Sequence, residues 1–527
     1  MNAPPQASPA PVTPALRLAR GGTGLLLGMT QGFGLYLVGN NLSSIQGSLA
    51  ATAAEASWMI TAYFATAMSS TLLLTKMRLH IGLRPFAIFG LWLFLAVAGL
   101  HLFADELVSA VALRAALGLA AAPLSTLAIL YMLEAMPMKL APVALLLGFA
   151  SLQLPGPLSR VVAPDLLEIG RWHGLFLLDV VLGVFSLAAI YAVPLTPQAP
   201  KPAFNRGDLI AFPLYAAGLA FLGVVLSQGR LAWWTDTPWL GMCLVAAVVC
   251  IGLYVLIDLN RPQPLLDLRW LTTPYMLRFI AAVLLFRMVL SEQTVGVVGL
   301  MTVLGQSNEQ MRTLFALASG GMLFGFLLAI VIAAKQGMHL LSVLAIALVL
   351  AVSWADSDAT SVSRPEQFYL TQTFLALALA LFFAAALLLG FGPVMQDGGR
   401  QIVSFLAAFS GAQYLGSLMG TAWINTLVAE RQTLHFSALA QHLAIGDPMV
   451  AQRIAQLTGS VARWIGDPAA RGRQGLTLLN QQVTRESFVL AYNDVFIQTA
   501  GLATLMLVWL SVLAWRGIRK QRALAAS

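Results

Sequence analysis

The sequence predicts an all-α polytopic membrane protein, and three observations predict it. Of the 527 residues, 59% are hydrophobic and only 10% are charged, whereas soluble proteins carry about 25% charged residues. Apolar runs long enough to cross a bilayer as helices, about 20 residues each, recur about fourteen times. The Lys and Arg residues gather in the short connections between these runs. A water-soluble fold is excluded, and the net charge of +8 reads as a topology signal in a lipid bilayer, not as a nucleic-acid surface.

The fourteen predicted spans follow one another with short connections, and each end is good to a few residues. Their even number puts both termini on one side of the membrane. The spans are 22–45, 57–77, 83–103, 107–133, 139–163, 173–194, 208–228, 238–258, 274–304, 312–334, 338–356, 368–394, 402–428 and 492–515.

The positive charges decide which side holds the termini. With the N-terminus inside, sixteen Lys and Arg residues fall in the inner connections and tails. The short outer connections hold four, namely Arg171, Arg230, Arg312 and Arg364. The positive-inside rule therefore predicts that both termini are cytoplasmic.

Two segments outside the spans are long. Residues 1–21 begin Pro-rich and lack the apolar core of a signal peptide, which predicts a disordered cytoplasmic tail. Residues 429–491 form an outer loop in which Asp447-Pro448 is a helix start. Two stretches there, Met449 to Ile465 and Leu476 to Val489, have helical periodicity.

The first of these stretches carries an apolar stripe, which runs through Val450, Ile454, Leu457, Val461 and Ile465. An amphipathic helix needs a cover for such a stripe. Two interpretations stand, a folded cap and a docking surface for a partner at Ile454 and Leu457. The two cysteines, Cys243 and Cys250, indicate neither a disulfide nor a metal site, and no cofactor is expected.

Several motifs occur in a characteristic order along nearly the whole chain. Ser57-Trp58-Met59-Ile60-Thr61 opens the second span, and LRAALGLAAAPL, residues 113–124, lies in the fourth. Gly156-Pro157 follows in the fifth span, and RWHGLFLLDVVLG, residues 171–183, enters the sixth. In this order and spacing they resemble the major facilitator superfamily, and more closely its fourteen-span drug:proton antiporters, the EmrB/QacA group.

The resemblance implies a fold and a function. The fold has a six-helix bundle at 22–200, a two-span insert at 201–270, and a second six-helix bundle at 271–527. The function is proton-driven export of amphipathic small molecules, drugs or toxic metabolites, from the bacterial inner membrane by alternating access. The resemblance also implies two partners, an EmrA-like membrane-fusion adaptor and a TolC-like outer-membrane channel. It assigns a gating role to Gly82, Arg84, Gly156 and Pro157.

Four departures from the group's motifs bear on mechanism. The acid of the first span is missing, since the chain reads Val38-Gly39-Asn40-Asn41 there. Leu79 stands where the group has Asp, Leu117 replaces the glutamine of RxxQG, and Ser159-Arg160 follow Gly156-Pro157 in place of glycines. The group's gating and coupling assignments therefore do not transfer directly.

Ionisable residues inside spans are costly and point to function. Glu292, in the middle of the ninth span, and Asp179 in the sixth are the candidates for proton coupling. Arg114, which also carries a motif match, is the first candidate for the transport cavity. The other cavity candidates are Asn40, Asn41, Arg287, Gln293, Gln413 and Tyr414. A structural role, such as a local Arg287–Glu292 ion pair or hydrogen bonds between helices, is the alternative for each.

Other function classes find less support. A channel needs rings of charge or filter carbonyls, and the sequence has no such repeated signature. A membrane enzyme needs a clustered catalytic set, whereas His80, His101 and His173 are scattered over different connections. A dedicated exporter or importer of one metabolite stays open.

Overall fold

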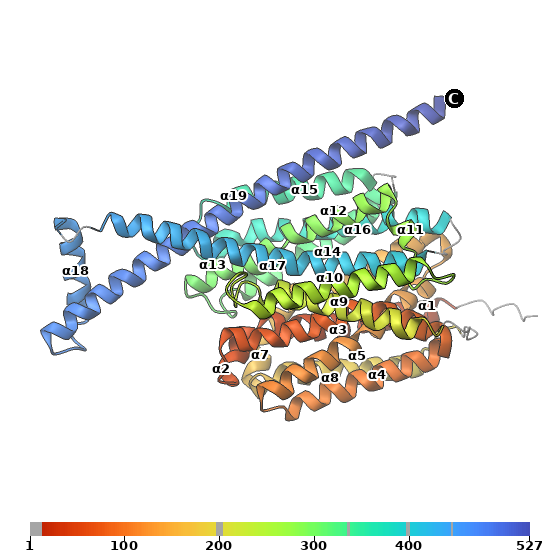
Figure 1. Cartoon of the computed structure of the whole chain (residues 1–527), viewed down its shortest axis with the longest axis horizontal. Helices are drawn as coiled ribbons and strands as arrows, with labels where there is room; N and C mark the ends of the chain where they lie inside the picture. Colours follow the sequence, from red (N-terminus) through yellow and green to blue (C-terminus); the bar gives the residue numbers. More distant parts are fainter. Residues whose placement is uncertain (1–12, 197–203, 335–337, 397–400, 444–445, 527) are drawn as a thin grey trace, which may run out of the picture. The chain divides into compact units, whose positions relative to one another are not determined.

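The computed structural model describes residues 13–196, 204–334, 338–396, 401–443 and 446–526, and their regular structure is entirely helical (Figure 1). Among them, eleven helices are long and apolar enough to cross a membrane. The other three predicted spans coincide with α1 (Pro14–Asn40), α3 (Ala53–Ile81) and α15 (Met338–Asp356). The all-α polytopic class is confirmed, and the count of fourteen spans stays a prediction.

The chain divides into two compact units. Unit 1 is Met1–Phe221, Ala246–Leu268 and Val394–Ala407, and unit 2 is Leu222–Val245, Arg269–Pro393 and Ala408–Ser527. The residues of the predicted insert 201–270 divide between the two units, so the three-part division stays a prediction.

Unit 1 is built around α5 (Leu107–Ala135), which contacts α1, α3, α4 (Leu83–Leu100) and α6 (Ala141–Gln153). Small residues permit the close approach, as is usual between membrane helices. A Cβ on Gly118 of α5 would lie 2.5 Å from the carbonyl oxygen of Tyr63. Its other helices are α2 (Leu42–Ser48), α7 (Pro155–Gly170) and α8 (His173–Ala192). Three further helices divide between the two units, namely α9 (Asp208–Gln228), α10 (Pro238–Leu259) and α11 (Leu268–Leu271).

Helix α1 begins at Pro14, so the prediction of a disordered tail over residues 1–21 is wrong for residues 14–21. Thr13 caps the helix by accepting the Leu16 backbone N–H, and Pro14 occupies the first helical position, where a missing N–H costs nothing. Residues 1–12 lie outside the described residues.

The fifth predicted span consists of two helices. Helix α6 ends at Gln153 and α7 begins at Pro155, because the two prolines of Leu154-Pro155-Gly156-Pro157 cannot continue the ladder of backbone hydrogen bonds. The Gly-Pro motif therefore lies at a break in the span.

Unit 2 contains the ninth span, which consists of α12 (Pro274–Val289), the π-helical turn Glu292–Val297 and α13 (Val298–Val303). Its other helices are α14 (Arg312–Ala334), α15, most of α16 (Tyr369–Gln396) and of α17 (Ile402–Gln441), α18 (Pro448–Ser460) and α19 (Pro468–Ala526). The rings of Phe286 and Phe382 stack with centroids 3.6 Å apart and tie α12 to α16. Glycines bring α17 against α12, since a Cβ on Gly416 would lie 2.6 Å from the carbonyl oxygen of Leu284.

The segment 429–491 is helical in most of its described residues. Helix α17 continues to Gln441, and α19 starts at Pro468 and runs unbroken into the last span. Asp447 caps α18 as predicted, accepting the Met449 N–H at 2.8 Å. The expected length of that helix is wrong, because α18 ends at Ser460 between two glycines, Gly459 and Gly466.

Helix α18 packs on the first part of α19, and Figure 1 shows α18 at an angle to α19 near the start of that helix. Gly475 of α19 permits this contact, since a Cβ there would lie 2.2 Å from the Thr458 hydroxyl. Leu457 is only 9% exposed, and Ile454 is half-buried. The chain's own next helix therefore covers the part of the stripe that lies on α18. We call α18, the first part of α19 and their connection the outer hairpin.

Candidate functional site

The π-helical turn places Glu292 in the interior of unit 2. Its side chain is fully buried, and one carboxylate oxygen, Oε2, accepts a hydrogen bond from the Ser353 hydroxyl of α15. The other oxygen, Oε1, has no hydrogen-bond partner. A π-helical turn re-aims the side chains of a helix and often marks a functional site.

A second buried acid, Asp356, lies one turn along α15 from Ser353. Asp356 is 4% exposed and accepts a hydrogen bond from the Gln372 amide at 2.8 Å. The backbone carbonyl of Gln372 accepts a hydrogen bond from the Gln293 side-chain amide at 3.0 Å. We call Glu292, Gln293, Ser353, Asp356 and Gln372 the acid cluster.

No salt bridge reaches the acid cluster within the described part of the chain. The local Arg287–Glu292 pair, the structural alternative for this glutamate, does not form. Sequence reasoning singled out Glu292 and Gln293, but it missed Asp356, which lies at the predicted end of a span and has no motif.

Unit 1 has its own buried charges, Arg114 on α5 and Asp179 on α8, each 1% exposed. Arg114 donates from Nη1 to the Gly34 carbonyl at 2.9 Å, and its guanidinium lies 4.5 Å from the centroid of the Tyr63 ring. Asp179 faces the same glycine, because a Cβ on Gly34 would lie 4.0 Å from its Oδ2, although no salt bridge of the described residues joins it to Arg114. The structure therefore brings Arg114 and Asp179 to one place on α1.

The asparagines of the first span join helices to one another. Asn40 donates from Nδ2 to the Gly156 carbonyl at 2.9 Å and to the Ser159 hydroxyl at 2.7 Å. These contacts tie the end of α1 to the start of α7, where the Gly-Pro motif with Pro157 lies. Asn41 is buried and donates to the Leu37 carbonyl of its own helix, which favours a structural role.

Gln413 and Tyr414 lie half-buried on α17 of unit 2. The Gln413 side-chain oxygen has no hydrogen-bond partner, so it is a candidate ligand contact. Among the described residues, no group of three or more His, Cys, Asp or Glu is arranged to hold a metal ion.

The connection from α3 to α4 turns at Gly82, whose φ of +88° favours glycine. Arg84 beside it is exposed. The basic residue of this region that makes buried contacts is Lys76, and sequence reasoning did not single it out. Lys76 donates to Asp208, the first residue of α9, at 2.8 Å.

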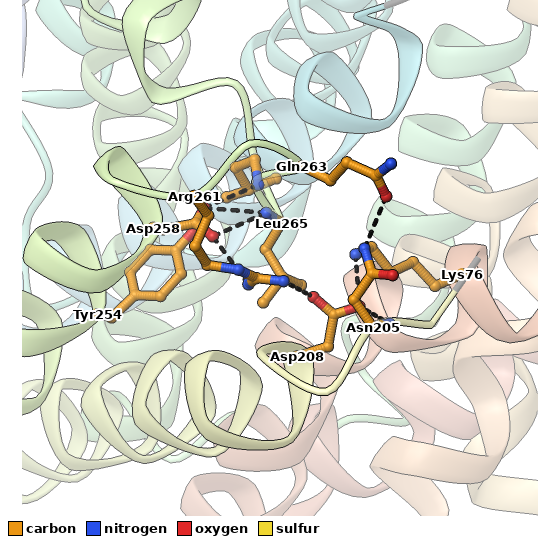
Figure 2. A network of polar contacts seen from close by, with 9 residues as sticks. Lys76, Asn205, Asp208, Tyr254, Asp258, Arg261, Gln263 and Leu265 are labelled. Atoms are coloured by element: carbon orange, nitrogen blue, oxygen red, sulfur yellow. Dashed lines mark hydrogen bonds and ion pairs between the residues drawn. The ribbon is translucent and has the colours of Figure 1, made fainter.

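Figure 2 shows how this contact continues into a network. Arg261 bridges Asp208 at 2.5 Å and Asp258 of α10 at 3.1 Å. Asp258 is also held by the Tyr254 hydroxyl and by the backbone N–H of Leu265. The network ties α3, α9 and α10 together at the ends that the predicted topology puts on the inner side. Arg261, which counts in the sequence only as one of the positive charges of the inner connections, therefore forms specific pairs, and its partner Asp208 was not singled out from the sequence.

No family model matches the chain. The fatty acid resistance protein FarB of Neisseria gonorrhoeae is 25% identical over 493 residues, which are 89% of this chain and 90% of FarB. The multidrug export protein EmrB of Haemophilus influenzae is 21% identical over 481 residues, with 89% and 90% covered. The xylose transporter XylE from E. coli has a similar structure, with a TM-score of 0.51 and 12% identity over 78% of this chain and 91% of XylE.

XylE belongs to the major facilitator superfamily, and its similarity to this chain at 12% identity concerns the fold. FarB and EmrB are similar along nearly nine-tenths of the sequence. The chain is a transporter with the major facilitator fold.

Its likeness to FarB and EmrB supports the EmrB-like group that the motifs predict. The transporter is a membrane protein and not an enzyme, since its relatives and structural neighbours are transporters. Each unit of the transporter contains a cluster of buried ionisable residues, Arg114 and Asp179 in unit 1 and the acid cluster in unit 2.

Proposed function

We propose that the transporter exports amphipathic small molecules across the bacterial inner membrane, driven by the proton gradient through alternating access. The names of its relatives support this substrate class, since FarB is a fatty acid resistance protein and EmrB a multidrug export protein. Fatty acids and many drugs share an apolar body and a polar or charged end.

The acid cluster is the observation that carries proton coupling. Glu292 and Asp356 are buried, and no cation pairs with them in the described ranges. A buried, unpaired carboxylate is costly, and protonation removes that cost. Loading and releasing a proton as water access changes is the chemistry that a coupled cycle needs. Asp179 is the second candidate, with Arg114 beside it as the counter-charge.

The candidates for substrate contact are proposed for each unit by itself. In unit 1 these are Arg114 and Asn40, with Asn41 in a structural role, and in unit 2 they are Arg287, Gln293, Gln413 and Tyr414. Gly156 and Pro157 lie directly after the break in the fifth span, and such a break lets a helix bend as access alternates. In this role Asn40 would hold the break through its bonds to Gly156 and Ser159.

We also propose that the transporter is the pump of a tripartite system with an EmrA-like adaptor and a TolC-like outer-membrane channel. Because α19 covers Leu457, the stripe at Ile454 and Leu457 is a poor docking surface. A better one lies on either side of α18, since Met449 at the start of the helix is 73% exposed and Trp464, in the turns that follow its end, is 86% exposed. Exposed aromatic and Met side chains are typical of interface anchors.

The test is transport in vesicles. The purified protein is reconstituted into liposomes, an inward or outward pH gradient is imposed, and accumulation of dodecanoate and of ethidium is followed separately. Proton-driven export predicts that accumulation reverses with the gradient and disappears with a protonophore. Accumulation that ignores the gradient would refute coupling, and transport of one compound alone would favour a dedicated exporter.

A further inference from the structure

A pocket of about 480 Å³ lies in unit 2, between the end of α17 and the outer hairpin. Its volume falls in the range of small-molecule sites, about 300–1,000 Å³. Apolar side chains supply most of its wall, with Leu439 from the end of α17, Leu443 just after it, and Leu479 and Val483 from α19. None of these residues belongs to a predicted span.

Two arginines supply the charge of the wall. Arg453 of α18 donates to the Gln482 side-chain oxygen at 3.1 and 3.3 Å, and to that of Gln456 at 3.3 Å. Arg485 of α19 donates to the Ser361 carbonyl. All these acceptors are neutral, and no salt bridge of the described residues involves either arginine. The two positive charges beside an apolar cavity therefore have no carboxylate partner.

Glu486 also lines the pocket, although no salt bridge joins it to either arginine in the part of the chain described. It lies beside Arg485 in sequence, on a helix surface open to water. Its single negative charge leaves the wall with a positive balance.

We propose that this pocket binds a single-chain fatty carboxylate, with its headgroup held by Arg453 and Arg485 and its alkyl chain against the four apolar side chains. A guanidinium pairs with a carboxylate through two parallel N–H donors, so arginine suits this headgroup better than lysine does. The apolar wall would shield the chain from water, while an organic cation would meet two like charges. This site lies outside the spans and does not rest on proton coupling or on the direction of transport.

The test is direct binding by the full-length protein in phosphatidylcholine nanodiscs, because detergent would compete for the pocket. A dodecanoate with a photoreactive diazirine is titrated, crosslinked and mapped by peptide mass spectrometry. Dodecyltrimethylammonium, a cation of equal chain length, and lysophosphatidylglycerol, a single-chain anionic lipid, serve as competitors. Variants are Arg453→Gln with Arg485→Gln, Glu486→Gln, the pocket-filling Val483→Phe, and Arg473→Gln as a control on the same helix outside the pocket.

We expect crosslinks in residues 439–443 and 479–486, and competition by unlabelled dodecanoate but not by the cation. The double arginine variant should bind about tenfold more weakly, because two charge-assisted hydrogen bonds are lost. Glu486→Gln should bind about two- to threefold more tightly, Val483→Phe should lose the crosslinks, and Arg473→Gln should match the wild type. Crosslinks elsewhere, equal binding by the double variant, or displacement by the lipid but not by dodecanoate would overturn the proposal.

Discussion

The Ser353 hydroxyl of α15 donates a hydrogen bond to the Glu292 carboxylate of the π-helical turn. Three residues further along α15, Asp356 accepts a hydrogen bond from the Gln372 side-chain amide, and the backbone carbonyl of Gln372 accepts one from the Gln293 side chain. Because helix positions three apart share a face, Ser353 and Asp356 lie on one side of α15. Each connects back to the π-helical turn, Ser353 through Glu292 and Asp356 through Gln372 and Gln293.

Arg114 should be required for transport. Arg114→Ala removes the donor to the Gly34 carbonyl and the cation over the Tyr63 ring, and it leaves Asp179 without a counter-charge. We expect transport to fall at least about tenfold at normal expression, since an uncompensated buried charge costs several kcal/mol. Arg114→Lys should restore part of it, because an ammonium lacks the planar fork.

The matched control for Arg114 is Arg278→Ala, because Arg278 is exposed on α12. Dye or fatty acid efflux from cells, normalised to membrane protein, is the measurement. A fully active Arg114→Ala variant would contradict the prediction and show that Arg114 has no role in transport.

The network of Figure 2 should stabilise the fold of unit 1. Asp208 is 3% exposed at its side chain and pairs with both Lys76 and Arg261. Asp208→Asn should therefore lower the free energy of unfolding by about 3 kcal/mol, seen as earlier thermal melting of the purified protein. The exposed Asp236→Asn, on the connection from α9 to α10, is the control.

A double-mutant cycle makes the Asp208 prediction specific. Lys76→Met combined with Asp208→Asn should cost less than the sum of the single changes, because paired residues do not act independently. Strictly additive costs would mean that the Lys76–Asp208 contact contributes nothing to stability.

Much of the fold could be predicted from the sequence, because the bilayer imposes a simple rule. Runs of about 20 apolar residues have to be helices, and each of the fourteen predicted spans coincides with helix in the structure. The break at Pro155 follows from proline's missing N–H. The start of α1 at Pro14 and the end of α18 at Ser460 were missed, because helix ends depend on capping and on local packing that hydropathy does not report.

The site was predicted in part. Burial cost alone identifies Glu292, Asp179 and Arg114, since each stands inside an apolar run. Asp356 and Lys76 lie at the ends of predicted spans, where charged residues are common. Only the folded structure shows that Asp356 is buried and that Lys76 is paired with Asp208. Asp258 could not be identified either, because a carboxylate at the end of a span is common in sequence. Its role is visible only in the fold, where the chain turns back and the Leu265 backbone N–H donates to it.

The outer hairpin should depend on Leu457 for its fold. Leu457→Asp places a charge against α19, and we expect the segment between α17 and α19 to become sensitive to protease. Met449→Asp, at an exposed position of the same helix, should leave the cleavage pattern unchanged. If the adaptor docks on either side of α18, Trp464→Ala should reduce adaptor co-purification without new cleavage. A protease-resistant Leu457→Asp variant would mean that α19 does not cover this residue.

Both termini should be cytoplasmic, because Lys and Arg favour the inner connections. Fusions of alkaline phosphatase and of green fluorescent protein to each end report the side directly. Fluorescence without phosphatase activity at both ends is expected. Phosphatase activity at the C-terminus would contradict the fourteen-span topology.

The central claim is that the buried carboxyl of Glu292 couples transport to protons, and proteoliposomes that carry Glu292→Gln test it most directly. The amide keeps the shape and can accept from Ser353, but it cannot exchange a proton at neutral pH. We predict that gradient-driven accumulation is lost while substrate counterflow persists, and that Asp356→Asn weakens accumulation in the same assay. Accumulation by Glu292→Gln at the wild-type rate under the same pH gradient would contradict the account.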